Sequence, residues 1–501
     1  MKGVSAGVSL APRAGRNISL KFLGEALSRA LAVVFVFYAA RKLGAEDFGR
    51  YSFAVSFAFL FVILTDLGLN TLLIRDVSRE RALAERYMGN VLAMKLILSL
   101  AAFLLIAAAI NLTAYPPLMV RVVCLTGLAL VFSALTDYMA AIFNAFERME
   151  LEALVKTANR LFMVVLGGGV LFMGRGLELF AAAVAAAHGA ALILAARLAS
   201  RRFGALRPRM ERRFWRELLR SALPLALSSV FMVVYYRIDV VMLSLMGGGD
   251  GELGLYSAAY KLVDTASLVP FLVVGGLFPI FSSLFRTSPE RLASIFETTV
   301  KYLLVAALPI AVGTTILAPR FMELIYGAEY AGGADLLRIL IWNIPLVFVN
   351  YPMLNLLVAV ERQRNNVIST GLCVVVNISL NALLIPAHGA AGAAAATVAT
   401  DAALLAMNCL FVRKYFGKIP LAALSYRPVA AAALMGVAVV RLDGAVALPV
   451  TVAAAAALYT ALAAVFGVVS AGEIRGLKSA LGRGPRGGGG PAPGGGDSGP
   501  L

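Results

Sequence analysis

The stretch AVALPVTVAAAAALYTALAAVFGVV, residues 445–469, decides the fold class because it contains no charged side chain. It is longer than the roughly 20 apolar residues that a helix needs to cross the hydrocarbon core of a bilayer. Residues 31–40, 98–110, 161–173 and 303–317 are uncharged too. The 501-residue chain is 60% hydrophobic and 15% charged, with a mean hydropathy of +0.84, whereas a soluble domain is about 25% charged. These values predict an integral membrane protein.

Hydropathy along the chain predicts about fourteen membrane helices, which makes this an all-α protein. The helices are expected near residues 20–40, 51–73, 88–110, 118–145, 155–173, 177–199, 219–246, 253–285, 298–318, 334–358, 366–386, 389–411, 426–441 and 445–469. The loops that should lie on the outer side are all short, the longest being residues 319–333.

The basic residues test this count, because cytoplasmic loops of membrane proteins are enriched in Lys and Arg. With the N-terminus placed inside, about three quarters of the 45 Lys and Arg residues fall on the inner side. We therefore expect a multi-pass protein of the cell inner membrane with both termini in the cytoplasm. The net charge of +17 then reflects topology, with attraction to anionic lipid as a secondary effect, rather than nucleic-acid binding.

Two short echoes indicate an internal repeat. DFGRYSFA at residues 47–54 resembles ELGLYSAA at 252–259, which lies 205 positions later. FER at 146–148 resembles VER at 360–362, which lies 214 positions later. The members of each pair are six predicted helices apart, and an even offset preserves helix direction. The pattern favours two parallel six-helix lobes, an arrangement typical of transporters with a central cavity.

This repeat predicts the organisation of the whole chain. The expected parts are a cytoplasmic N-terminal segment (1–19), a first six-helix lobe (20–200), a basic cytoplasmic linker (201–218), a second six-helix lobe (219–412), helices 13 and 14 (413–470) and a Gly/Pro-rich disordered tail (471–501).

Several motifs resemble the polysaccharide flippases of the multidrug/oligosaccharidyl-lipid/polysaccharide exporter superfamily. They are LGAEDFGRY at 43–51, DLGL at 66–69, IRDV at 74–77 and GLYSAAYK at 254–261. The resemblance extends over residues 17 to 470. It implies transport of an undecaprenyl-diphosphate-linked oligosaccharide repeat unit from the inner to the outer leaflet. It also implies membrane lipids, a polysaccharide polymerase and chain-length proteins as partners.

Charged residues inside membrane helices are costly and therefore mark candidate sites. We expect Arg29, Arg237 and Lys261, together with Arg50, to line the route with positive charge. Guanidinium groups bind phosphate oxygens in a bidentate manner, which suits a diphosphate. The alternative is local pairing, as in Glu25–Arg29 and Lys261–Asp264.

Polar uncharged residues and one carboxylate form a second group of candidates. Asn350, Asn377, Asn381 and Asp137 are candidate contacts for sugar or for an ion. Hydrogen bonding between helices is the alternative use of the amides. The two histidines and three cysteines have no metal-ligand spacing, so neither a metal nor another cofactor is expected.

Three other functions compete with a polysaccharide flippase. A membrane enzyme is not expected, because neither a catalytic constellation nor a large outer loop is recognisable. A cation-coupled multidrug exporter would concentrate carboxylates in one lobe, whereas the candidate lining here is mainly basic. A flippase for the peptidoglycan precursor lipid II stays open as an alternative.

Overall fold

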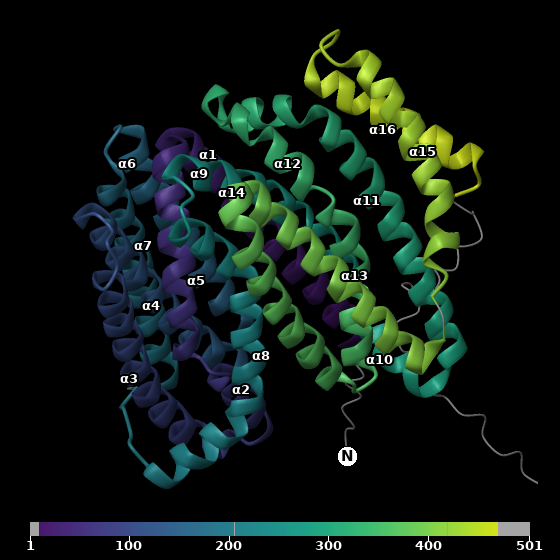
Figure 1. Ribbon diagram of the computed structural model, residues 1–501. Coiled ribbons are helices and arrows are strands. Elements are labelled where there is room, and N and C mark those ends of the chain that lie inside the picture. The colour runs from purple at the N-terminus through teal and green to yellow at the C-terminus, as the bar shows by residue number, and fades with distance from the viewer. Residues whose placement is uncertain (1–9, 205, 418, 469–501) are drawn as a thin grey trace, which may run out of the picture.

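The computed structural model describes residues 10–204, 206–417 and 419–468, with side chains from residue 31 onward. Within these ranges every regular element is a helix, which confirms the all-α prediction. The predicted tail at 471–501 lies outside the described residues, as do residues 1–9 of the predicted segment at 1–19, whereas residues 10–19 form the start of a helix. Figure 1 shows the helices running side by side, with their connections gathered at two opposite ends.

The first half of the chain forms one group of helices, on the left of Figure 1. It comprises α1 (Leu10–Val62), η1 (Ile63–Thr65), α2 (Leu69–Arg79), η2 (Arg81–Leu83), α3 (Ala84–Asn111), α4 (Pro117–Ala145), α5 (Met149–Phe162), the π-helical turn η3 (Met163–Gly167), α6 (Gly168–Phe172) and α7 (Leu177–Phe203).

The second half begins after the linker. It comprises α8 (Arg212–Leu245), α9 (Asp250–Ala266), α10 (Leu268–Thr287), α11 (Pro289–Tyr326), η4 (Ala328–Gly333), α12 (Ala334–Leu340), α13 (Asn343–Ala359), α14 (Gln363–Phe416), α15 (Leu421–Leu442) and α16 (Leu448–Val465). The last two pack on α11 through a separate apolar cluster that includes Leu317, Met435 and Tyr459.

Within the described ranges, eleven helices are long and apolar enough to cross a membrane, or twelve if one bent pair is a single span. Two of these helices cover 49 and 54 residues, and each joins two helices across a non-helical glycine, Gly44 or Gly389. A straight helix of that length would measure roughly 80 Å, more than twice the hydrocarbon thickness. The expected number of about fourteen stays a prediction.

The two glycine breaks are built in the same way. Gly44 has φ 79° and Gly389 has φ 54°, values in the left-handed region that glycine adopts without strain. The backbone N–H after each break donates to a carboxylate: Ala45 to Glu329 at 2.9 Å and Ala390 to Glu252 at 2.6 Å. Each carboxylate caps the start of the helix that follows the break.

Prolines explain two further breaks in the second half. Pro270 and Pro345 have no N–H to bond the carbonyl four residues earlier. The chain accordingly breaks at Ser267 between α9 and α10, and η4–α12 meets α13 at a bend of 47° beside residue 341.

The predicted outer loop at 319–333 is wrong in its first half, because α11 continues through Pro319 to Tyr326. Pro319 leaves the carbonyl of Thr315 without its helical donor. The Arg338 side chain donates to that carbonyl at 3.3 Å, which satisfies it and lets the helix continue.

The two copies of the second sequence echo, at 146–148 and 360–362, have matching backbone geometry. Glu147 and Glu361 have φ values of 60° and 62°. Around them, Arg148 N–H donates to the Phe143 carbonyl at 2.8 Å, and Arg362 N–H donates to the Leu357 carbonyl at 2.7 Å. These equivalent bonds are 214 positions apart, as in the sequence, and support an internal repeat. The exact lobe boundaries stay predictions.

Candidate functional site

The two copies of the first echo pack against each other. A Cβ on Gly49 would lie 2.0 Å from the Asp250 carbonyl oxygen, and one on Gly254 would lie 1.8 Å from the Ala45 carbonyl oxygen. The partner residues are again 205 positions apart, so the contact is related by the symmetry of the repeat. Only glycine allows backbones to approach this closely. We call Ala45, Gly49, Arg50, Asp250 and Gly254 the interlobe clamp.

Ionic contacts reinforce the interlobe clamp. Arg50 Nε donates to Asp250 Oδ2 at 2.8 Å, and the same guanidinium bonds Asp47 and Glu46. The Tyr330 hydroxyl of the second half donates to the Ala40 carbonyl at 2.7 Å. The two halves are therefore closed against each other at this end.

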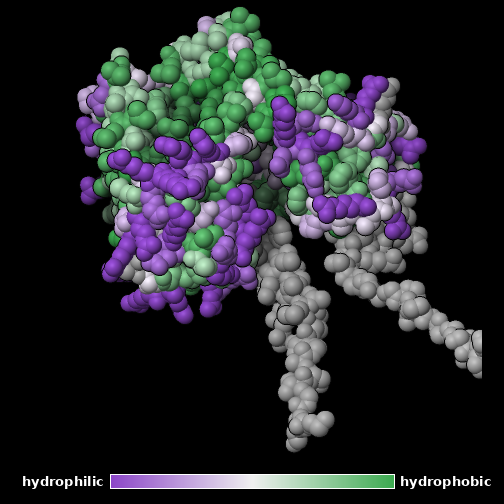
Figure 2. Space-filling model, turned by 90° about the horizontal axis from the view of Figure 1, so that it is seen from below, coloured by the Kyte–Doolittle hydropathy of each residue, from purple (hydrophilic) through white to green (hydrophobic). Residues whose placement is uncertain are grey.

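A pocket of about 310 Å³ lies between the two halves, away from the interlobe clamp. It is lined by Phe59, Met232, Val233, Tyr236, Arg237, Tyr260 and Asp264, and we call it the interlobe pocket. α1, α8 and α9 contribute these side chains. Figure 2 shows hydrophilic surface gathered on two lobes that are separated by a furrow.

Arg237 is the charged group that distinguishes this pocket. Its guanidinium carbon lies 5.1 Å from the centre of the Phe59 ring, within reach of a cation–π interaction. Among the described residues, no carboxylate forms an ion pair with Arg237. A guanidinium in this position has donors available for an anionic ligand.

Lys261 lies beside the pocket rather than in its lining. Its ammonium is 2.8 Å from Asp264, and the Lys261 side chain is 32% exposed. Asp264 also lines the pocket, so the structure brings Arg237 and Lys261 to the same region. The predicted local pair Lys261–Asp264 is present. An anionic ligand would have to compete with Asp264 for Lys261.

The other two predicted basic residues differ in their placement. Arg29 belongs to α1, but its side chain lies outside the described residues. Arg50 belongs to the interlobe clamp, where three carboxylates neutralise it. A role of Arg50 in cargo binding stays a prediction, to which the ion pairs add no support.

Asp239, two residues from Arg237, faces the interior of the second lobe. Asn381 donates to its Oδ1 at 2.7 Å and Thr397 donates to its Oδ2 at 2.7 Å. Asn377 in turn accepts from Asn381 at 3.0 Å, and Tyr256 adds a longer bond at 3.4 Å. We call Asp239, Tyr256, Asn377, Asn381 and Thr397 the Asp239 cluster.

The Asp239 cluster is suited to a small cation. Asp239 is 5% exposed and Asn381 is fully buried, and the described residues supply no basic partner for the carboxylate. A buried carboxylate without a counter-charge takes up a proton or a cation. Oxygen atoms are available, since Asn381 Oδ1 has no hydrogen-bond partner.

A neighbouring cluster holds the third predicted asparagine. Asn350 donates to the Asp401 carbonyl at 3.1 Å and accepts from Asn408 at 3.0 Å. Tyr235 bonds the Asp401 carboxylate. Asn350, Asn377 and Asn381 are therefore all buried and bond other protein groups, as expected if these amides serve hydrogen bonding between helices. Their burial gives no support to direct sugar contacts.

Asp137 lies in the first half, near a buried ammonium. Lys95 is 1% exposed and pairs with Asp66 at 2.8 Å, and Asp137 interacts with it electrostatically. Asp137 itself is exposed. Its contact with an ion or a sugar stays a prediction.

Sequence reasoning missed how Arg237 and Asp239 divide their roles. Residues two apart point to different sides of a helix, which sends one to the pocket and the other to the interior. The aromatic lining, Phe59, Tyr236 and Tyr260, was missed as well. The sequence did offer one signal for the Asp239 cluster. Polar residues recur in otherwise apolar helices, with Asn377 and Asn381 four positions apart.

Fold and site together define a two-lobed, multi-span membrane protein of the transporter type. Residues 14–285 match the family described as "Polysaccharide biosynthesis protein", and residues 224–383 match MatE. The chain belongs to the polysaccharide biosynthesis protein family, which confirms the resemblance found in its motifs.

Individual proteins resemble this chain in sequence or in fold. A probable low-salt glycan biosynthesis flippase, Agl15 of Haloferax volcanii, is 21% identical over 79% of this chain and 82% of its own length. The inward closed structure of the lipid II flippase MurJ has a TM-score of 0.72 at 14% identity, over 89% of this chain and 98% of that one. An inward-facing multidrug resistance MATE family transporter of the MOP superfamily has a TM-score of 0.65 at 15% identity, over 79% and 95%.

Proposed function

We propose that this protein is a flippase that moves a polyprenyl-diphosphate-linked oligosaccharide from the cytoplasmic to the outer leaflet by alternating access. The observation that carries the proposal is Arg237, which lines the interlobe pocket and forms no ion pair with any residue that the structure describes. A charged group at membrane depth is retained where it meets a ligand or a partner. Family membership and the name of the Haloferax volcanii relative support a lipid-linked glycan as cargo.

The lining of the pocket matches the two chemical parts of such a cargo. Arg237 offers a planar set of donors for phosphate oxygens, with Lys261 close by. Tyr236, 53% exposed, and Tyr260 offer aromatic faces and hydroxyl groups to a sugar. The polyprenyl tail remains in the lipid between the lobes. Arg29, on α1, is proposed to join the phosphate contacts.

The end of the molecule that is closed indicates the direction of transport. The basic linker lies at the end opposite the clamp, and we propose that this end faces the cytoplasm of a cell inner membrane. The described state is then open inward. Opening of the clamp, with closure of the opposite end, exposes the headgroup outside. We propose that a proton or monovalent cation at the Asp239 cluster drives this exchange.

The test is to delete the gene and measure lipid-linked intermediates by mass spectrometry, with complementation by variants. Accumulation of an oligosaccharide diphosphate lipid that wild type abolishes supports the function. Because a charge-assisted hydrogen bond contributes about 1.5–3 kcal/mol, Arg237→Ala should slow transport roughly 10- to 100-fold. Arg175→Ala, in an exposed loop between α6 and α7, is the matched control.

The assay separates the competing functions. An accumulated lipid II pool would reassign the cargo to the peptidoglycan precursor. An unchanged lipid pool with new sensitivity to cationic dyes would overturn the flippase and point to drug export. Full complementation by Arg237→Ala together with Lys261→Ala would keep the function and discard the site.

A further inference from the structure

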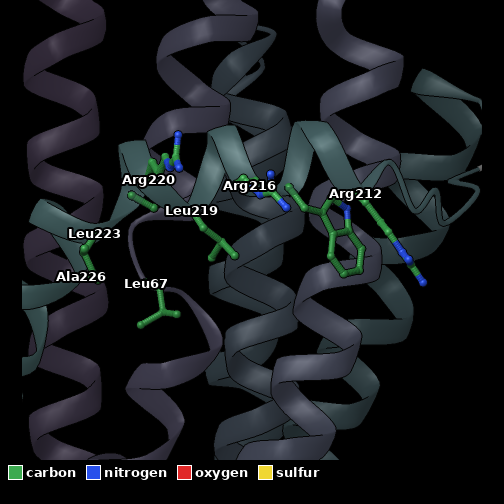
Figure 3. Close-up of a pocket in the computed structure, with 9 residues that line it drawn as sticks. Leu67, Arg212, Arg216, Leu219, Arg220, Leu223 and Ala226 are labelled. Atoms are coloured by element: carbon green, nitrogen blue, oxygen red, sulfur yellow. The ribbon is translucent and has the colours of Figure 1, made fainter.

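The start of α8 forms a second pocket, at the end of the molecule opposite the interlobe clamp. This pocket has a volume of about 520 Å³ and is lined by Leu67, Arg212, Trp215, Arg216, Leu219, Arg220, Ala222, Leu223 and Ala226. Figure 3 shows three of these arginines spaced along α8, with Leu67 on the neighbouring turn. The pocket is distinct from the interlobe pocket and shares no residue with it.

This part of α8 is firmly attached on one side. Phe214, Leu218 and Ala222 are buried in the core of the first lobe. The residues just before and after the helix start are pinned to α3: Arg86 pairs with Glu211 at 2.7 Å, and Trp215 Nε1 donates to Asn90 at 2.9 Å. The Arg86 guanidinium holds the pKa of Glu211 below its ordinary value, so this ion pair persists at neutral pH.

The opposite side of the same helix carries exposed leucines. Leu219 is 42% exposed and Leu223 is 69% exposed, and both line the pocket with Leu67. A helix of this kind, with leucines and arginines on one surface, lies in the interface of a membrane. The leucines reach toward the acyl chains and the arginines toward the headgroups.

The arginine side chains that line the pocket indicate the kind of ligand it would bind. Arg212, Arg216 and Arg220 recur every four residues and therefore lie along one face, about 6 Å apart. Among the described residues, none of the three forms an ion pair, whereas the outward-facing Arg213 pairs with Glu217. Three uncompensated guanidinium groups beside an apolar pocket fit a ligand with an anionic head and an alkyl tail.

We propose that this pocket binds an anionic phospholipid such as phosphatidylglycerol, with its phosphate on Arg216 and Arg220 and an acyl chain along Leu67, Leu219 and Leu223. The lipid bridges the α1–α2 turn and the linker helix that joins the two lobes. The site is separate from cargo transport, so it stands or falls independently of the proposed flippase function.

Trp215 supplies a reporter at the site, because the chain has only two tryptophans, Trp215 and Trp342. In a Trp342→Phe background, the full chain is reconstituted in phosphatidylcholine vesicles. Brominated phosphatidylglycerol or brominated phosphatidylcholine is then added at equal mole fraction, and quenching of Trp215 is measured. The site predicts several-fold stronger apparent binding of the anionic lipid.

Variants then locate the headgroup contact. Each basic residue near an anionic lipid strengthens binding about fivefold, so Arg216→Gln with Arg220→Gln should remove most of the preference. Arg216→Lys with Arg220→Lys retains charge and should retain part of it. Arg213→Gln, an exposed arginine of the same helix, is the matched control and should have no effect. A melting curve for each variant verifies folding.

Two results would overturn the proposal. Equal quenching by the two brominated lipids would show that the pocket does not select an anionic head. An equal loss of preference in Arg213→Gln and in the Arg216/Arg220 variants would show diffuse attraction to basic charge rather than a site.

Discussion

At the scale of single residues, Arg237 and Asp239 lie two positions apart on α8 but have different surroundings. Arg237 offers its donors to the interlobe pocket, and Asp239 is enclosed by amide and hydroxyl groups of α14. Their separation follows from helix geometry, since positions two apart differ by about 200° around the axis. One short segment thus carries both the proposed anion-binding group and the proposed coupling group.

Asp239→Asn tests the coupling group. The amide keeps the shape of the side chain but removes the charge that holds a proton or cation. We expect transport driven by an imposed H⁺ or Na⁺ gradient to fall roughly tenfold, equal to about 1.4 kcal/mol, while binding of cargo persists. The measurement is uptake of a fluorescent lipid-linked oligosaccharide by proteoliposomes with each gradient in turn. Transport by Asp239→Asn that still responds fully to the gradient would exclude this residue.

At the scale of elements, α1 and α9 approach each other closely, and this contact keeps the two lobes together at the interlobe clamp. Both glycines of the interlobe clamp face backbone carbonyls rather than flexible side chains. Neither contact can adapt to an added methyl group without movement of a helix.

Gly254→Ala should therefore open the clamp. Overpacking costs about 1–3 kcal/mol, which shifts the ratio of closed to open molecules by roughly 5- to 150-fold. Spin labels on Lys42→Cys and Gly249→Cys, in a background without native cysteines, should report a longer distance. Gly251→Ala is the matched control, because nothing lies within 4 Å of a Cβ at that position. The idea fails if both alanine variants give the wild-type distance.

The two carboxylate caps allow a second test at this scale. Glu252 caps α14 within the second lobe, whereas Glu329 of the second lobe caps a helix segment of the first. Loss of either cap should cost about 1 kcal/mol, so Glu252→Ala and Glu329→Ala should lower the melting temperature to a similar degree. Only Glu329→Ala should lengthen the distance between the two spin labels. The same lengthening in Glu252→Ala would argue against a special interlobe role.

At the scale of the whole molecule, two lobes meet at the interlobe clamp and are joined by the linker at the other end. The linker and the start of α8 are rich in arginine, at positions 201, 202, 207, 209, 212, 213, 216 and 220. We expect this basic segment to face the cytoplasm, and the direction proposed for transport follows from that expectation.

Labelling of single cysteines tests the orientation. Arg213→Cys and Arg175→Cys are placed separately in a chain whose native cysteines, Cys124, Cys373 and Cys409, are replaced. An impermeant maleimide added to intact cells should label position 175 and leave position 213 unlabelled until the membrane is opened. The reverse pattern would contradict the proposed direction.

Much of the fold could be predicted from the sequence because the membrane imposes it. Uncharged runs such as residues 445–469 require helices, since lipid offers no partner for backbone polar groups. The echoes at 47–54 and 252–259 predicted a repeat, and the structure packs them against each other. Breaks near Pro270 and Pro345 follow from the missing N–H.

Side-chain partners were decided by the tertiary structure alone. Nothing local in the sequence tells that Arg50 meets Asp250, that Glu329 caps the helix after Gly44, or that Arg338 bonds Thr315 and lets α11 pass through Pro319. Hydropathy determines which segments enter the membrane, because the free energy of transferring a segment from water into lipid depends on the composition of that segment alone. Pairing between helices depends on rotation and packing against distant segments, so only the assembled lobes separate the interlobe pocket from the Asp239 cluster.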